Sequence, residues 1–172
     1  MHSARRKRVI TERGVKDKAP VIGILERGGK VHANVIPTRR KHHLQAEIRA
    51  HVAAKSAIYT DALMSYQGLN PDFAHQTIDH AERYVQGQVH TNGLENFWSL
   101  LKRGLKGTYV AVEPFHLFRY VDEQVFRYNN RATKEHFIGD GDRFQMAMRH
   151  IANRRITYEQ LTGKGTDTVH QA

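Results

Sequence analysis

The chain has 172 residues, with 27 lysines and arginines against 17 aspartates and glutamates, a formal net charge of +10. This length fits one compact domain with tails, and the lack of cysteine excludes a disulfide scaffold, a zinc ribbon and thiol catalysis. The positive charge favours a polyanionic partner, nucleic acid or an anionic membrane surface. No apolar run approaches the ~18 residues of a membrane span, and no signal-peptide pattern follows the basic start. We therefore expect an intracellular protein without a membrane segment.

The first half of the chain predicts a basic head followed by a β-hairpin. Residues 1–18 are rich in arginine and lysine, which favours a solvated segment that attracts phosphates. The unbroken apolar run over 21–25 predicts a strand covered on both faces. A Gly28-Gly29 pair then signals a hairpin turn, and residues 31–35 alternate between apolar and polar as in a half-buried strand.

After residue 40 the pattern changes to helices with two short strands between them. Leu44, Ile48 and Val52 recur every four residues, which predicts an amphipathic helix from Lys41. Strands are expected at 57–60 and 73–78, and helices at 92–105, from Pro114 to 128, at 144–151 and near Tyr158. This order predicts a mixed α/β domain over 19–162 with some parallel pairing, followed by a flexible tail at 163–172. It excludes an all-helical DNA-binding module and an all-β barrel.

Asp61 directly follows the expected strand at 57–60. A carboxylate in this position can project from the edge of a sheet and hold a divalent cation. The alternative is structural, because an aspartate here can also start the turn over 60–63 or cap a short helix. The spacing alone favours the structural interpretation.

Glu95 falls in the first turn of the helix expected from Asn92. It shares one helical face with Ser99, Lys102 and Lys106, opposite an apolar stripe. An acid followed by cations suits a metal-bound phosphodiester whose flanking phosphates need positive contacts. Equally, Asn92 can cap the helix while Glu95 completes a capping box, which requires no chemistry. The residues alone leave both interpretations open.

The remaining polar residues give weaker signals. The 12 histidines are spread without metal-ligand spacing, and there is no H-E-x-x-H motif or phosphate-binding glycine loop. A lone histidine is usually structural or exposed, so no histidine metal site is predicted. A stripe containing Arg127 and Arg131 fits either a contact along a nucleic-acid backbone or a solvated helix end.

One string carries a family resemblance. Residues 89–103, Val-His-Thr-Asn-Gly-Leu-Glu-Asn-Phe-Trp-Ser-Leu-Leu-Lys-Arg, resemble the C-terminal catalytic motif of insertion-sequence transposases of the ISXO type, relatives of the eukaryotic Merlin elements. Further segments agree in order, and they are residues 21–23 with 26–29, Tyr59-Thr60-Asp61, 107–109, 116–117 with 119–123, and 126–131. The resemblance extends from residue 5 to residue 162.

The resemblance implies a ribonuclease-H-like fold, a mixed sheet flanked by helices, with a triad of two aspartates and a Glu or Asn. Such a site holds two Mg²⁺ or Mn²⁺ ions, which activate water or a DNA 3′-hydroxyl for in-line attack on a phosphodiester. Asp61 is implied as the second aspartate and Glu95 as the third acid, both metal ligands, with Asn92 the competing third position. The candidate DNA contacts are Lys102, Arg103, Lys106, Arg127 and Arg131.

The sequence departs from the family pattern in two places. Relatives carry their first aspartate on a strand just before a basic segment, and here that basic segment is the N-terminus. Asp17 follows the basic run and cannot substitute, so we expect the first metal ligand and the central strand of the sheet to be lacking. Two carboxylates leave a two-metal site under-coordinated, and a lost central strand exposes its neighbours' edges. In addition, Val110 follows Tyr109 where relatives usually have histidine.

The sequence therefore predicts a DDE-type transposase catalytic domain whose DNA cleavage and strand transfer are impaired. Its expected partners are DNA, a second copy of itself or a full-length transposase, in the cytoplasm at the nucleoid. The alternative is a non-catalytic DNA-binding remnant or regulator, which the net charge supports equally well. A poorly folding pseudogene product is a third interpretation.

Overall fold

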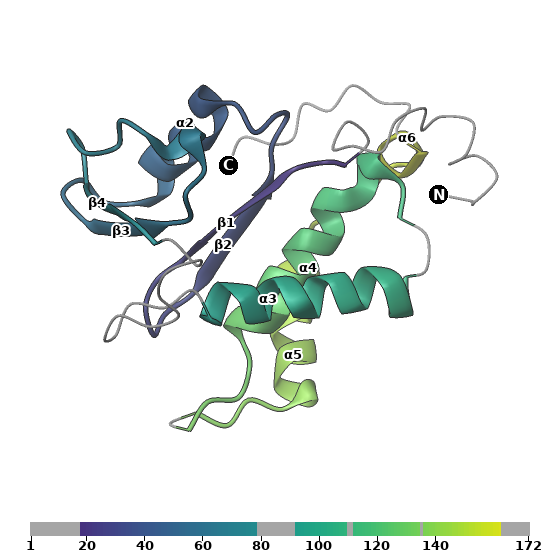
Figure 1. The fold of residues 1–172 in the computed structure, drawn as a ribbon. Helices are drawn as coiled ribbons and strands as arrows, with labels where there is room; N and C mark the ends of the chain where they lie inside the picture. Colours follow the sequence, from purple (N-terminus) through teal and green to yellow (C-terminus); the bar gives the residue numbers. More distant parts are fainter. Residues whose placement is uncertain (1–17, 79–91, 110–111, 135, 163–172) are drawn as a thin grey trace. The chain divides into compact units, whose positions relative to one another are not determined.

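The computed structural model describes residues 18–78, 92–109, 112–134 and 136–162 (Figure 1). The chain divides into two compact units, Met1–Asn129 and Asn130–Ala172. The expected basic head up to residue 17, and the expected tail at 163–172, lie outside the described residues. Within the described ranges, no helix combines the length and the apolar composition that crossing a bilayer requires. The first unit contains β1 Val21–Leu25, β2 Val31–Val35, α2 Lys41–His51, β3 Ala57–Thr60, β4 Ala74–Thr77, α3 Asn92–Arg103 and α4 Leu117–Asn129.

The predicted hairpin is confirmed. Strands β1 and β2 pair antiparallel, with Val21 opposite Val35 and Leu25 opposite Val31. Gly28 occupies the turn with φ +70°, a left-handed conformation that glycine adopts without steric cost. The hairpin therefore forms where the glycine pair and the alternating pattern indicated.

The expected parallel pairing is present between β3 and β4. Ala57 lies opposite Ala74 and Thr60 opposite Thr77. A 3-10 turn at Met64–Tyr66, rather than a long helix, lies between the two strands in the chain. Helix α2 instead connects β2 to β3, and within the described ranges those strands belong to two separate two-stranded sheets.

One face of the β1–β2 hairpin packs against α2. The predicted amphipathic pattern supplies Leu44 and Ile48 from the helix, and the buried Gln45 side chain donates to the carbonyl oxygens of Ser65 (3.2 Å) and Gln67 (2.9 Å). These bonds satisfy a buried amide and hold the 3-10 turn against α2. The apolar core on this face consists of Ile22, Ile36, Leu44, Ile48, Leu69 and Phe73.

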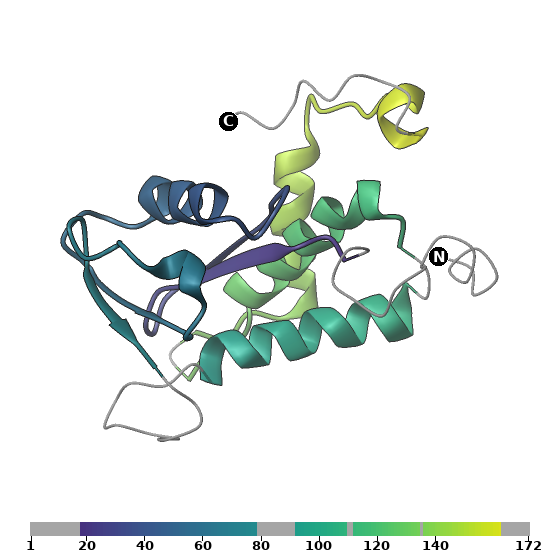
Figure 2. The same cartoon turned by 45° about the horizontal axis from the view of Figure 1, so that its top comes forward.

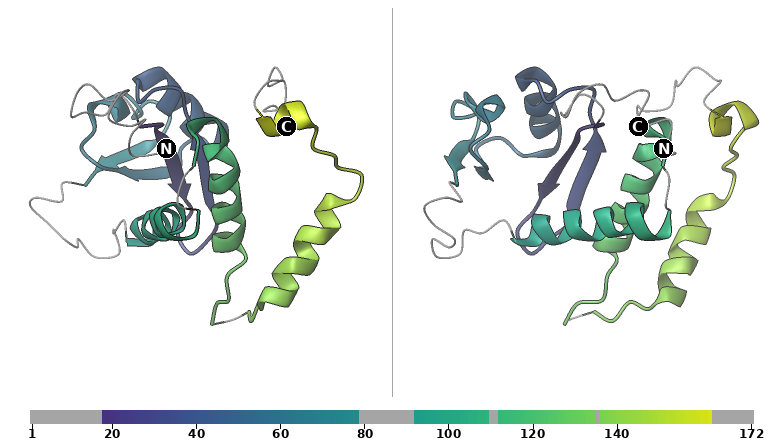
Figure 3. Two further views of the ribbon diagram at one scale, coloured as in Figure 1. Left: turned by 90° about the vertical axis from the view of Figure 1, so that its right-hand side faces the viewer. Right: turned by 45° about the vertical axis from the view of Figure 1, so that its right-hand side comes forward.

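The opposite face of the hairpin packs against α3 and α4 (Figure 2). Figure 3, left, looks along α3 and shows α4 beside β2. Phe97 and Val121 are fully buried here. Gly23 is required for this packing, since a Cβ at this position would lie 2.5 Å from the ring of Trp98. Helices thus cover both faces of the hairpin, as the apolar run of β1 indicated. The buried residues of this second core are Val31, Ala33, Phe97, Leu101, Val121 and Tyr128.

Two helix ends differ from the sequence expectation. The helix expected to run to residue 105 ends at Arg103, and Gly104–Thr108 form a π-helical turn. Glycines at 104 and 107 weaken the α-helix at this point, because glycine has a low helix propensity. The helix expected from Pro114 starts with a 3-10 turn, Pro114–His116, before α4 begins at Leu117.

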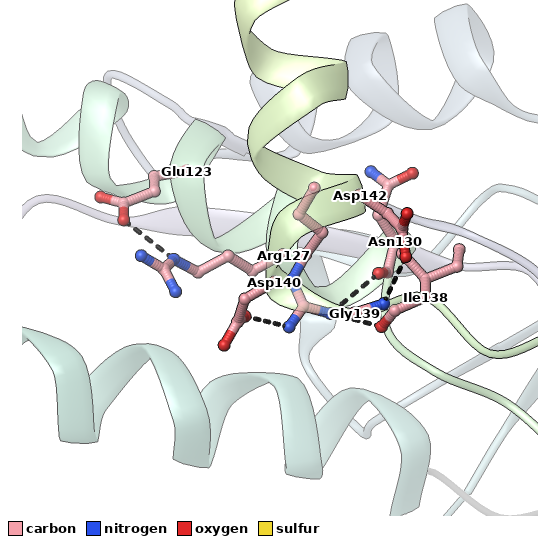
Figure 4. A network of polar contacts seen from close by, with 8 residues as sticks. Glu123, Arg127, Asn130, Ile138, Gly139, Asp140 and Asp142 are labelled. Carbon is pink, nitrogen blue, oxygen red and sulfur yellow. Dashed lines mark hydrogen bonds and ion pairs between the residues drawn. The ribbon is translucent and has the colours of Figure 1, made fainter.

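The second unit contains α5 Asp140–Ile151 and α6 Tyr158–Thr162, near the two helical patterns expected there. The start of α5 is held by polar contacts, in which Asp142 accepts a 2.8 Å hydrogen bond from the Gly139 N–H (Figure 4). Arg143 pairs with Asp140 and donates to the Ile138 carbonyl oxygen. Several apolar side chains of this unit are exposed, among them Phe137, Phe144, Met148 and Ile151.

Candidate functional site

Asp61 is exposed and lies directly after β3. Its Oδ1 accepts a 3.2 Å hydrogen bond from the Leu63 N–H, so the turn role considered for this residue is present. A carboxylate has lone pairs on both oxygens, and one turn bond leaves acceptor capacity for a cation. Burial raises the pKa of the Tyr66 hydroxyl, and the negative charge of Asp61 raises it further.

The side chain of Thr60 ties β3, the strand that leads to Asp61, to β4. The Thr60 hydroxyl donates to the Asp61 carbonyl oxygen (3.0 Å) and lies 2.8 Å from His75 Nε2 on β4. In Figures 1 and 2, β4 runs toward the end of α3 at which that helix begins.

Glu95 lies in this first turn. It is exposed together with Ser99, Lys102 and Lys106, while Phe97 on the other face is buried. The predicted division of the helix into a polar and an apolar face is therefore confirmed. The side chain of Asn92 lies outside the described residues, so its predicted roles, helix cap or third catalytic position, stay predictions.

Tyr128 on α4 fixes the first turn of α3. Its hydroxyl donates a 3.0 Å hydrogen bond to the Gly93 carbonyl oxygen, and its ring meets Phe97 edge-on at 5.5 Å. Gly93 in turn sits against β1, because a Cβ there would lie 2.6 Å from Leu25 Cδ2. The backbone that carries Glu95 is therefore held from two sides.

Asn129, the next residue, fixes α4 to β2. Its Oδ1 accepts from the Val31 N–H and its Nδ2 donates to the Val31 carbonyl oxygen, both at 2.8 Å. The side chain thus replaces a strand partner at the start of β2 and satisfies two backbone groups. The sequence analysis did not identify Tyr128 and Asn129 as residues that position α3 and β2. The signal was available, because two side chains with polar groups follow each other at the end of an apolar helical stripe.

The five candidate DNA contacts fall into two sets. Lys102 and Arg103 are exposed at the end of α3 and Lys106 in the π-helical turn that follows, and no ion pair of theirs is recorded among the described residues. Arg127 is exposed but pairs with Glu123 at 2.9 Å (Figure 4). Arg131 lies beyond the end of α4, in the second unit, so a continuous helical stripe from Arg127 to Arg131 does not form.

Glu123 also holds the turn that follows α3. The Tyr109 hydroxyl donates to Glu123 Oε2, and this hydrogen bond, with a smaller contribution from burial, raises the pKa of Tyr109. The π-helical turn before Tyr109 is therefore anchored to α4. Such turns occur often at functional sites.

The described residues contain one group of three close metal-ligating side chains, and it includes neither Asp61 nor Glu95. Its members are His32, Glu47 and His51, for which the sequence predicted no site. The proposed carboxylate pair consists of two exposed acids at the ends of separate elements. Any sharing of a cation by Asp61 and Glu95 stays a prediction.

The chain is similar to known transposase sequences. The family model for the ISXO2-like transposase domain matches residues 2–129, which ends at the last residue of the first unit. A protein of Haemophilus influenzae described as an uncharacterized transposase-like protein is 32% identical over 106 residues, covering 61% of this chain and 85% of that protein. No solved structure gives a significant match. The chain belongs to the ISXO2-like transposase domain family.

Proposed function

We propose that the first unit is the catalytic domain of a DDE-type transposase, a class of enzyme that uses Mg²⁺ or Mn²⁺ to cleave DNA and transfer strands, and that these steps are impaired in this chain. Asp61 and Glu95 are the metal ligands in this proposal. The observation that carries it is the family match over residues 2–129, because that match includes both acids and the helix that bears Glu95.

The edge of β1 supports a ribonuclease-H-like sheet. Just beyond the two ends of the ladder, Glu26 N–H bonds to the Lys30 oxygen and Ile36 N–H to the Pro20 oxygen. Hydrogen-bonded pairs alternate along an antiparallel ladder, so between these bonds Ile22 and Ile24 are the β1 residues in hydrogen-bonded pairs with β2. The backbone groups of Val21, Gly23 and Leu25 therefore point to the other edge, where no partner is recorded among the described residues. A strand covered by helices on both faces is normally internal to a sheet, which favours a larger sheet that continues past β1.

The chemistry of the two acids suits this function. Mg²⁺ is bound by oxygen ligands in octahedral geometry and keeps several waters, so two carboxylates leave room for water and for phosphate oxygens of DNA. Asp61 and Glu95 would hold the ions, which when bound would polarise the phosphodiester and stabilise the leaving oxygen. Lys102, exposed on α3 like Glu95, and Lys106, exposed in the π-helical turn that follows α3, supply positive charge for the flanking phosphates.

The experiment is a strand-transfer assay with DNA that carries the ends of the element, in Mg²⁺ and in Mn²⁺. For these 172 residues alone, two carboxylates leave a two-metal site under-coordinated, so we expect no detectable transfer. Robust transfer that Asp61→Ala abolishes would contradict the impairment and support the catalytic assignment. Transfer that survives both Asp61→Ala and Glu95→Gln would overturn the assignment of the two acids.

A non-catalytic DNA-binding role is the second candidate, favoured by the net charge of +10 and by the exposed cations Lys102 and Arg103 at the end of α3 and Lys106 in the turn that follows. This role requires a gel shift that weakens with salt and persists in a chain carrying both Asp61→Asn and Glu95→Gln. Lys102→Gln and Lys106→Gln should each reduce the salt slope, the slope of the logarithm of the DNA-binding constant against the logarithm of the salt concentration, by about one. A slope unchanged by both substitutions would remove these lysines from the DNA interface.

A further inference from the structure

Two histidines and a glutamate meet between β2 and α2, away from the apolar core of that face. His32 projects from β2, while Glu47 and His51 lie one turn apart on α2. The rings of His32 and His51 stack with centroids 3.6 Å apart. One potential ligand atom from each of the three side chains lies within 4.8 Å of the other two.

Two atoms of this cluster are buried without a hydrogen-bond partner in the structure. They are His32 Nε2 and Glu47 Oε2, which lie 3.8 Å apart. This separation is too long for a hydrogen bond. Leaving a buried polar atom unsatisfied is costly, so each of these two atoms requires a partner, which a water molecule or a cation can supply.

The distances fit a bound metal ion better than a direct contact. A tetrahedral Zn²⁺ with ligands at 2.0–2.1 Å places neighbouring donor atoms about 3.4 Å apart. Glu47 Oε2 lies 3.8 Å from His32 Nε2 and 3.7 Å from His51 Nδ1. Small side-chain adjustments bring the three donors into range, with a fourth position left for water.

The surroundings orient the carboxylate and favour the neutral form of the His32 ring. Asn34 Nδ2 donates to Glu47 Oε1 at 3.3 Å, which turns the second oxygen toward the histidines. The Glu47 carbonyl oxygen lies 2.9 Å from His51 Nδ1, a hydrogen bond that this nitrogen must give up when it binds the ion instead. Burial, with the nearby His51 as the next cause, lowers the pKa of His32, and the neutral imidazole is the form that binds metals.

We propose that His32, Glu47 and His51 bind a divalent transition-metal ion, with Zn²⁺ as the probe, at a site separate from Asp61 and Glu95. Two imidazoles and one carboxylate are a donor set that zinc accepts, whereas Mg²⁺ prefers oxygen ligands alone. The ion clamps α2 to β2. This inference does not rest on the proposed transposase chemistry, because none of the three residues belongs to the carboxylate pair.

The test is calorimetric titration of the untagged 172-residue chain with ZnCl₂, in buffer that contains excess MgCl₂. We expect one zinc ion to bind per chain, and we expect this binding to require the cluster of His32, Glu47 and His51. Glu47→Gln and His51→Gln should each weaken zinc binding by at least about tenfold, the lower range for disturbing a metal site. Neither residue belongs to the apolar core, and circular dichroism verifies that both variants fold.

His150→Gln is the matched control. His150 is exposed at the end of α5 and makes the same kind of contact, its Nδ1 lying 2.7 Å from the Met146 carbonyl oxygen four residues earlier. Zinc affinity should be unchanged in this variant. The proposal is overturned if the wild-type chain binds no zinc, or if Glu47→Gln and His51→Gln both bind it as tightly as His150→Gln does.

Discussion

The two faces of the β1–β2 hairpin are built differently. Along β2 the side chains alternate, so that Val31 and Ala33 face α3 and α4 while His32 faces α2. The first face is closed by aromatic and aliphatic residues around Phe97. The second combines an apolar core with a polar cluster whose buried ligand atoms lack hydrogen-bond partners.

The two faces therefore have different roles: one positions α3, and the other carries potential metal ligands. The apolar face, with the hydrogen bonds of Tyr128 and Asn129, sets where α3 begins and hence where Glu95 lies. The face toward α2 carries donor atoms suited to a metal ion. Substitutions on the first face should therefore change stability most, and those on the second should change ligand binding most.

The largest effect is expected from Phe97→Ala. Phe97 is fully buried between the hairpin and α4, and truncating such a side chain costs about 3–5 kcal/mol of unfolding free energy. Urea unfolding followed by circular dichroism measures it. Phe144→Ala is the matched control, since that ring is 65% exposed and its loss should cost about 0.5 kcal/mol or less. If the two variants lost the same unfolding free energy, Phe97 would not lie in the core.

Asn129→Ala comes next. It removes both hydrogen bonds to Val31 and leaves buried backbone groups unsatisfied, each costing about 1–3 kcal/mol. The same urea experiment applies, with Asn96→Ala as control because Asn96 is exposed on α3. If the two variants were equally stable, the Asn129 side chain would not hold the start of β2.

Tyr128→Phe should have a smaller effect on stability but a local one on α3. Removing the hydroxyl deletes its bond to Gly93 at a cost of about 1 kcal/mol. Amide hydrogen exchange should accelerate in the first turn of α3 while staying slow in α2. Tyr158→Phe, at a tyrosine that is 73% exposed, should change neither region. Uniform acceleration in both helices would mean that the hydroxyl does not act on α3 in particular.

The smallest effect on stability is expected for Arg127→Gln. The pair of Arg127 with Glu123 is exposed, with 61% and 38% of the two side chains accessible, and such pairs contribute about 0–1 kcal/mol. If Arg127 contacts DNA as proposed, the salt slope of binding falls by about one. A loss of stability much above that range would show that the ion pair is structural.

The elements with local signals were predictable from the sequence. The glycine pair predicted the hairpin, the four-residue apolar period predicted α2, and the apolar stripe around Phe97 predicted which face of α3 is buried. Helix ends were less predictable, because Gly104 and Pro114 turned out to introduce a π-helical and a 3-10 turn next to the α-helices. Such local choices depend on packing as well as on propensity.

The positions of the two candidate acids were predictable from local patterns, while their role as a site stays a prediction. Asp61 and Glu95 were named from their position after a strand and in a first helical turn, and the structure has them exposed at those positions. The histidine cluster could not be found this way, because His32 lies on a strand and meets α2 only through tertiary packing. The four-residue spacing of Glu47 and His51 was the available signal, but it gave two of the three ligands.

The central claim is that Asp61 and Glu95 share a divalent cation, and paramagnetic broadening by Mn²⁺ in the ¹⁵N-labelled chain tests it most directly. Substoichiometric Mn²⁺ should broaden the amide signals of both Asp61–Leu63 and Gly93–Asn96, and either Asp61→Asn or Glu95→Gln should abolish the broadening in both segments. Glu26→Gln, at an exposed acid in the hairpin turn, should leave it intact. Broadening in only one segment, or broadening that persists in both variants, would contradict the claim.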